Sequence, residues 1–94
     1  MRWDARSDEN QEEVMTAIRE LGGDCVSLHR LGQGAPDILG VFYGHWFVAE
    51  VKGDGAKLTP REREWHDRLG RHGEIFIWHG WLDVFEQFEK WRLE

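Results

Sequence analysis

The sequence predicts an α/β domain in which a small mixed β-sheet is flanked by helices, in the chain order α-β-β-β-α-β-α. Three observations predict this class. Apolar residues recur at helical spacing in three segments, short runs rich in β-branched and aromatic residues lie between them, and glycine or proline stands at most junctions. Ninety-four residues suffice for one modest core, so we assign residues 1–94 to a single domain.

The first half of the chain is expected to form one helix and three strands. The helix covers Asp8 to Leu21 and ends at Gly22-Gly23, a common helix stop. Its apolar stripe consists of Val14, Ala17, Ile18 and Leu21. The segment CVSLHRL, Cys25 to Leu31, is expected to be a strand, and GQGAPD a loop. DILGVFYGHWFVAEVKG then predicts a β-hairpin around a two-residue turn, the commonest hairpin length.

The second half predicts helix, strand and helix. Thr59 is the expected N-cap, Pro60 the first helical residue, and Glu62 completes a capping box. This helix runs to about Leu69. Glu74 to Trp78 should be a short strand, and Leu82 to Arg92 a final helix. We expect helices on both faces of the sheet, because its strands are apolar on both sides. Accordingly, the residues expected in the core include Trp46, Trp65 and Phe76.

Composition and charge limit the function classes. The net charge of −6 argues against a simple nucleic-acid-binding domain, which would usually be basic. Six of the twelve Lys and Arg residues nevertheless fall between positions 52 and 71, which suggests either a local basic patch or ordinary solvated helix faces. A single cysteine, Cys25, excludes an internal disulfide and a cysteine-rich zinc site. The chain lacks a long apolar run and an apolar signal core, so a cytoplasmic location is expected.

The hairpin contains the most unusual group of charges. With Tyr43-Gly44 as the turn, Phe42 faces His45 and Asp37 faces Glu50, with Cβ atoms roughly 5 Å apart. Lys52 lies on the same side of the strand as Glu50, because side chains alternate. Two facing carboxylates near a buried sheet destabilise it unless a cation compensates them. Mg²⁺ is typically held by one or two carboxylates. The alternative interpretation is a structural salt bridge between Glu50 and Lys52.

At these residues the sequence resembles a known family. PD at 36–37, a hairpin and then EVK at 50–52 are similar to the PD-(D/E)xK nuclease signature. More narrowly, residues 8 to 80, with the KLTPREREW segment, resemble the VRR-NUC family in its small stand-alone form, typical of phages and prophages. The resemblance implies a restriction-endonuclease-like core, and a protein encoded by a phage or prophage that acts in the bacterial cytoplasm.

The resemblance also implies roles for individual residues. Asp37, Glu50 and the backbone carbonyl of Val51 would bind Mg²⁺ or Mn²⁺, and Lys52 would orient or deprotonate the attacking water. Glu13 matches a glutamate that points at the metal site in related nucleases, although a solvated glutamate is an equal alternative. The remaining candidates are expected to contact DNA: Arg30, Lys57, Arg61 and Glu62. At Glu62 the family usually has Gln, and the capping box already gives this residue a structural role.

The expected function is therefore metal-dependent cleavage of DNA, with branched DNA such as a four-way junction as the family-level expectation. Symmetric cutting of a junction needs two active sites, which predicts a homodimer. Two alternatives stay open. One is a non-catalytic DNA-binding or interaction domain that retains the nuclease fold, and the other is a structural protein in which Glu50 and Lys52 form a salt bridge.

Overall fold

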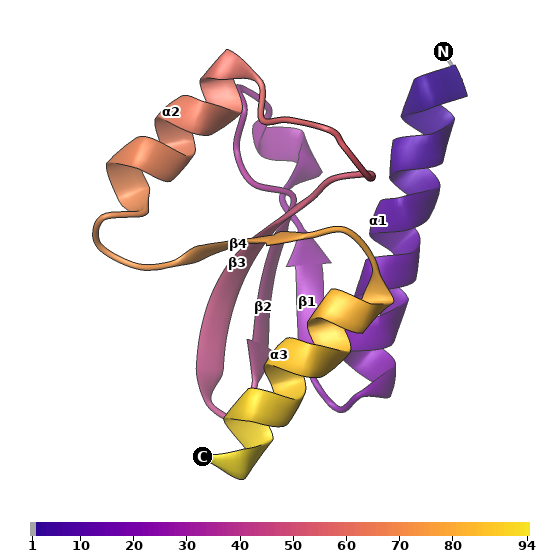
Figure 1. Cartoon of the computed structure of the whole chain (residues 1–94), viewed down its shortest axis with the longest axis vertical. Helices are drawn as coiled ribbons and strands as arrows, with labels where there is room; N and C mark the ends of the chain where they lie inside the picture. The colour runs from indigo at the N-terminus through magenta and orange to yellow at the C-terminus, as the bar shows by residue number, and fades with distance from the viewer. Residues whose placement is uncertain (1) are drawn as a thin grey trace.

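The computed structural model describes residues 2–94, with side chains from residue 10 onwards. Its helices and strands are α1 (Arg2–Glu20), β1 (Asp24–Ser27), β2 (Ile38–Phe42), β3 (His45–Val51), α2 (Pro60–Leu69), β4 (Ile75–Trp78) and α3 (Trp81–Leu93), with a short 3₁₀ helix, η1 (His29–Leu31). This order confirms the predicted α-β-β-β-α-β-α arrangement (Figure 1). Across the described residues, no helix has the length and apolar character needed to cross a membrane.

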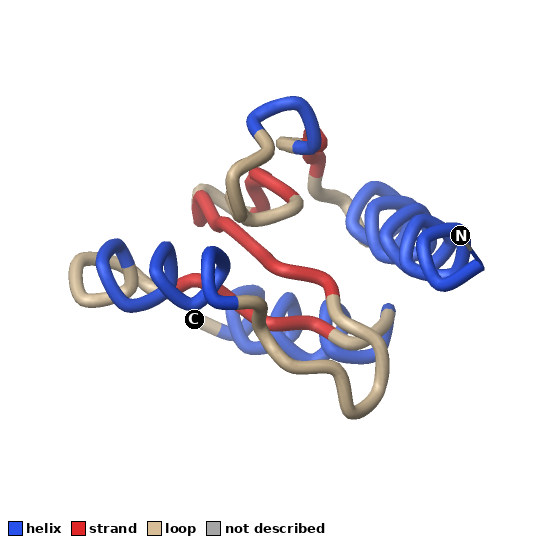
Figure 2. The backbone as a smooth tube through the Cα atoms, turned by 90° about the horizontal axis from the view of Figure 1, so that it is seen from above, coloured by secondary structure: helices blue, strands red, loops and turns tan. Residues whose placement is uncertain are grey.

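The four strands form one mixed sheet in the order β1-β2-β3-β4. The pairs β1–β2 and β2–β3 are antiparallel, whereas β4 runs parallel to β3. A parallel pair needs a crossover connection, and α2 provides it between β3 and β4. Seen from above in Figure 2, the strands run between α1 on one side and α2 on the other.

The hairpin register agrees with the prediction. Phe42 pairs with His45 and Ile38 with Ala49, so Tyr43 and Gly44 form the turn. Their φ angles are 51° and 79°, and two positive φ values are characteristic of a type I′ turn. This turn matches the right-handed twist of the flanking strands and thereby holds the register that brings Asp37 opposite the Glu50 position.

Several element boundaries differ from the predictions. The expected strand from Cys25 to Leu31 is wrong in its second half, because β1 stops at Ser27 and η1 follows. The Ser27 hydroxyl accepts a hydrogen bond from the His29 backbone N–H at 3.1 Å, and such a local bond competes with strand pairing. Helix α1 begins earlier than expected, at Arg2, and α3 is one residue longer at each end.

One face of the sheet, which we call the closed face, packs against α1 and α3. The buried apolar residues are Val14, Ile18, Cys25, Ile38, Phe42, Phe47, Ala49, Trp78, Val84 and Phe88. Aromatic rings fill its centre: Phe42 and Phe88 stack with centroids 4.0 Å apart, and Phe47 lies 5.3 Å from Trp78. Phe76 packs against this core as a partly buried residue. The closed face therefore contains the hydrophobic core.

The opposite face, which we call the open face, is only partly covered. It presents Leu39, Val41, Trp46, Val48 and Glu50, because side chains alternate along β2 and β3. The expectation that Trp46 is a core residue is wrong, since 72% of it is exposed. Trp65 on α2 is half-buried outside the core and donates from Nε1 to the Gln33 carbonyl at 3.0 Å.

Helix α2 covers the open face incompletely. Between α2 and the strands lies an apolar groove of about 400 Å³, and its walls include Leu31, Leu39, Trp46, Trp65 and Leu69. No residue of α2 is fully buried. Helices thus lie on both faces of the sheet, as expected, but they seal only the closed one.

Candidate active site

Asp37 is held next to the last residues of β3 by backbone and side-chain bonds. Its backbone N–H donates to the Ala49 carbonyl at 3.1 Å, and its carbonyl accepts from the Leu28 N–H at 2.8 Å. Its carboxylate oxygen Oδ2 accepts a hydrogen bond from the Val51 backbone N–H at 2.8 Å. Asp37 therefore lies beside the strand segment that contains both Glu50 and Lys52.

Glu50 is the one buried charged residue among those that the structure describes, with 1% of its surface exposed. Burial, followed by the neighbouring Asp37 carboxyl and the charge of Glu62, raises the pKa of Glu50 to about 9, although Lys52 acts in the opposite direction. Without a further cation, the surroundings of Glu50 therefore favour its protonated form. A rigid central strand thus holds a carboxyl group that its surroundings disfavour in the ionised form.

Lys52 forms an ion pair with Glu62 rather than with Glu50. The Lys52 Nζ atom lies 2.7 Å from Glu62 Oε1, and both side chains are largely shielded from solvent. The structural alternative, a Glu50–Lys52 salt bridge, is therefore wrong as a description of the ion pairs in the described part of the chain. The side chains of Glu50 and Lys52 point to the same face of the sheet, but the Lys52 ammonium contacts Glu62 of α2.

Glu62 has two functions at the start of α2. Its Oε1 accepts from the Thr59 backbone N–H at 2.9 Å, and the Glu62 N–H donates to the Thr59 hydroxyl at 3.2 Å, which confirms the predicted capping box. Burial by itself would raise the pKa of Glu62, but the Lys52 ammonium and the Thr59 N–H hold that pKa below its usual value. Glu62 is thus an ionised partner of Lys52.

His66 is a site residue that the sequence analysis missed. Its Nε2 lies 3.5 Å from Glu50 Oε1, and its side chain is 12% exposed. Burial lowers the pKa of His66, which favours the neutral ring. The signal that could have found it is its spacing: His66 follows Glu62 by one helical turn and therefore shares its face of α2.

The other predicted site residues lie apart from this group. Glu13 is exposed on α1, Arg30 on η1 and Lys57 in the loop before α2. Arg61 is exposed and hydrogen-bonds Gln33. Among the described residues, no hydrogen bond or ion pair joins any of these four to Asp37, Glu50 or Lys52. The structure thus brings together Asp37, Glu50, Lys52 and Glu62, and adds His66.

The donor set fits a hard divalent cation. Glu50 and Asp37 offer carboxylate oxygens, and the Val51 carbonyl lies on the same strand segment. No cluster of three or more Asp, Glu, His or Cys side chains disposed to hold a metal occurs in the described chain. Two carboxylates are nevertheless what Mg²⁺ usually takes from a protein, since it keeps several waters and binds substrate oxygens. A cation would also favour the ionised form of Glu50.

Comparison with known proteins confirms the fold. No family model matches the sequence, and no curated protein matches it significantly. By structure, however, the chain is similar to a solved structure described as a VRR_NUC domain. The TM-score is 0.73, the sequences are 25% identical, and the match covers 88% of this chain and 94% of that one. The resemblance inferred from the PD and EVK residues is therefore supported by the whole arrangement of helices and strands.

Proposed function

We propose that this chain, which has the fold of a VRR-NUC domain, is a metal-dependent endonuclease that hydrolyses phosphodiester bonds in DNA. One observation carries the proposal. Glu50 is buried to 1% exposure beside a second carboxyl group, and both its burial and this neighbour disfavour its ionised form. Such a costly arrangement is typical of functional sites.

Each residue of the site has a role in this reaction. Asp37, Glu50 and the Val51 carbonyl would hold Mg²⁺ or Mn²⁺. When bound, the cation polarises the scissile phosphate and lowers the pKa of a bound water. The Lys52 ammonium orients the attacking water and stabilises the negative charge that develops on the phosphate. Its ion pair with Glu62 holds the ammonium in place, and the strand keeps Glu50 and Lys52 at a constant separation. Glu13 stays a prediction as a further catalytic residue.

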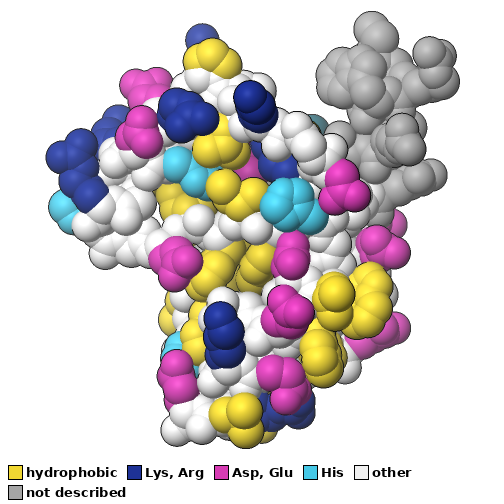
Figure 3. Space-filling view, viewed as in Figure 1, with side chains coloured by type: hydrophobic (Ala, Val, Ile, Leu, Met, Phe, Trp, Pro, Cys, Tyr) yellow, Lys and Arg dark blue, Asp and Glu magenta, His cyan; other side chains and the backbone are white. Residues whose placement is uncertain are grey.

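Half of the Lys and Arg residues of the chain fall between positions 52 and 71, where a DNA backbone would approach the site. Figure 3 shows Lys and Arg side chains over α2 and the loop before it, whereas Asp and Glu predominate over the rest of this side. Lys57 and Arg61 belong to this patch, and Arg30 lies on η1. We assign these three to phosphate contacts, which position a duplex without reading its sequence.

We further propose that the enzyme is a homodimer that prefers branched DNA. Cutting two strands of a junction requires two active sites, and one chain supplies one. The exposed Trp46 and the mostly apolar residues that line the groove beside it give the open face an apolar surface that a second copy would cover. Size-exclusion chromatography with light scattering tests this directly. A mass of one chain at micromolar concentration would contradict both the homodimer and junction resolution.

The decisive experiment is cleavage of labelled single-stranded, duplex, flap and four-way-junction DNA in Mg²⁺, Mn²⁺ or EDTA. The wild type is compared with Lys52→Ala and with Lys90→Ala, which removes an exposed lysine of α3 as a matched control. We expect metal-dependent cutting by the wild type and by Lys90→Ala, and none by Lys52→Ala. Absence of cutting by folded wild type in both metals would overturn the proposal.

One observation favours a second candidate, a DNA-binding or interaction domain that does not cut. Glu62 stands where the resembling family has Gln, and its carboxylate neutralises the Lys52 ammonium at 2.7 Å. A neutralised lysine stabilises an anionic phosphate less well. Under this alternative, the same DNA panel would show binding without cleavage, and Glu62→Gln would not create cleavage.

A further inference from the structure

Helix α2 contacts β3 through two matched pairs of side chains. Glu62 binds Lys52 and His66 lies against Glu50, so residues four apart on the helix meet residues two apart on the strand. Four helical residues advance about 6 Å along the axis. Two strand residues advance about 6.6 Å. The two spacings match, which allows both contacts to form when α2 lies along the end of β3.

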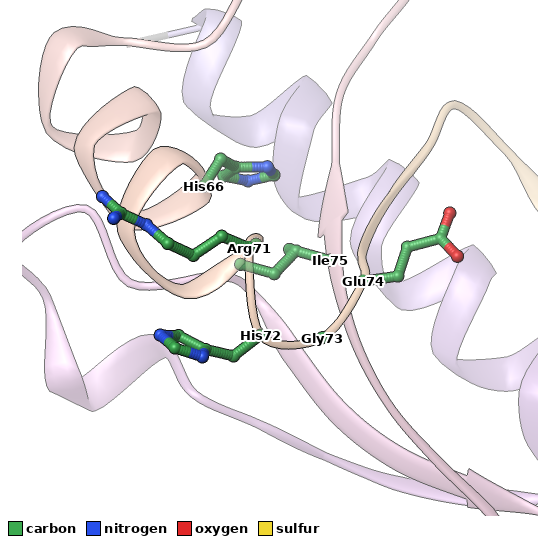
Figure 4. A pocket seen from close by; sticks show the side chains of 7 residues that line it. His66, Arg71, His72, Gly73, Glu74 and Ile75 are labelled. Carbon is green, nitrogen blue, oxygen red and sulfur yellow. The ribbon is translucent and has the colours of Figure 1, made fainter.

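The orientation of His66 sets it apart from the polar side chains that follow it. Figure 4 shows its ring directed from α2 towards the strands, whereas the side chains of Arg71 and His72 extend the other way. These three residues line a hollow of about 480 Å³ at the end of α2. Arg71 and His72 are exposed, and only His66 reaches from that hollow to the Glu50 carboxyl.

Glu50 depends on this contact once it is ionised. A buried carboxylate needs hydrogen-bond donors, because it has lost its water. Among the described residues, His66 Nε2 is the one nitrogen within hydrogen-bonding distance of the Glu50 carboxyl. The Lys52 ammonium is bound to Glu62, and the Val51 N–H donates to Asp37.

We propose that His66 is a positioning residue for the cation ligand Glu50. The His66 Nε2–H donates to Glu50 Oε1, which fixes the rotation of the carboxylate and leaves Oε2 available to a cation that this site would hold. Hydrogen bonds of this kind to metal-ligating groups typically contribute 10–100-fold to metal affinity. The inference rests on the proposed function, because it assumes that Glu50 binds a divalent cation.

The test is Mn²⁺ binding without DNA, measured by isothermal titration calorimetry on the full chain. We expect His66→Ala to weaken Mn²⁺ binding about 10–100-fold. His66→Gln should recover most of the loss, because its amide can donate to the same oxygen. The matched control is His72→Ala, which removes an exposed histidine of the same region and should bind like wild type. Affinity of folded His66→Ala within twofold of wild type would overturn the proposal.

Two spectroscopic measurements on the wild type make the test independent of the stability of any variant. In the Mg²⁺-loaded protein, ¹⁵N NMR should report the Nε2-protonated tautomer of His66, and an Nδ1-protonated ring would contradict the proposal. Pulsed EPR of bound Mn²⁺ should show no histidine nitrogen coupling. Such a coupling would make His66 a direct ligand instead.

The outcomes also separate this inference from the function on which it rests. If the wild type binds Mn²⁺ and cuts DNA but His66→Ala does so equally well, only the role of His66 fails. If the wild type neither binds Mn²⁺ nor cuts DNA, the nuclease itself is wrong, and the role of His66 falls with it.

Discussion

The two faces of the sheet are built from the same strands but differ in the residues that they carry and in the helices that cover them. The closed face carries Phe42, Phe47 and Trp78, which pack against α1 and α3. The open face carries Glu50 and a largely exposed Trp46, and α2 approaches it across an apolar groove. The buried carboxyl group of Glu50 thus lies on the face where α2 is attached by polar contacts and apolar packing is sparse.

The difference teaches how a small chain combines stability with a costly site. Apolar packing on one face provides the free energy of folding, which leaves the other face free to hold two carboxyl groups and an ammonium in close proximity. If this division is correct, substitutions on the closed face should affect mainly stability. Substitutions of the site residues on the open face should affect mainly function.

The largest effect should come from the core. Phe88 is 2% exposed and stacks on Phe42, so Phe88→Ala should lower the free energy of unfolding by about 3–5 kcal/mol. At a protein concentration too low for the proposed homodimer, Trp46→Ala, which removes an even larger side chain from the open face, should cost less than about 1 kcal/mol, because 72% of it is exposed in the single chain. Urea denaturation of both variants measures the contrast. Equal losses would show that the open face is covered in solution.

The next effect concerns catalysis. Lys52→Ala should reduce the cleavage rate about 10²–10³-fold, the usual loss when one donor to a developing negative charge is removed. Its melting temperature should fall below that of Lys90→Ala, because the shielded Glu62 carboxylate loses its cation, but the fold should persist, because Glu62 keeps its hydrogen bond from Thr59. Single-turnover cleavage and thermal denaturation are measured on the same samples. A large fall in melting temperature with cleavage retained would reverse the assignment.

The pH dependence of stability tests the burial of Glu50. Its folded pKa of about 9 lies above the ordinary 4.5, so the folded state binds more protons than the unfolded state between these values. The stabilisation from protonated Glu50 is complete below pH 4.5 and is lost as pH rises towards 9. The slope from this one group is at most about 1.4 kcal/mol per pH unit.

Glu50→Gln should remove that pH dependence and raise the stability of the metal-free protein at pH 7, because the amide does not ionise. Denaturation of both proteins in EDTA across this pH range measures the effect, and added Mn²⁺ should stabilise the wild type alone. Glu86→Gln, a substitution of an exposed residue on α3, is the matched control. Parallel stability curves for Glu50→Gln and wild type would show that Glu50 is ionised in the fold.

The smallest effect should come from the cap of α2. Thr59→Ala removes the hydroxyl that accepts from the Glu62 N–H and should cost about 1 kcal/mol. Thr59→Ser keeps that acceptor and should restore most of the loss, as chemical denaturation would show. If both variants were equally unstable, the capping bond would not be what holds this end of α2.

The sequence by itself determined the features that depend on neighbouring residues. Helical periodicity, the Thr59 capping box and the Tyr43-Gly44 turn predicted the element order, and the turn also set the register that aligns Asp37 with Glu50. The early end of β1 also has a local cause, the Ser27 hydroxyl bond, which the sequence analysis overlooked. Each of these interactions joins residues that are only a few positions apart, so the residue types that form it can be recognised in the sequence.

Only the tertiary structure decided which face is sealed and which partners meet across it. Trp46 is of a residue type that is expected in a core, but its exposure depends on where α2 lies after the crossover. The same placement pairs Lys52 with Glu62 and brings His66 to Glu50, contacts between residues 10 and 16 positions apart. Apolar character is a property of each residue, whereas burial is a property of the packed molecule and depends here on where α2 lies.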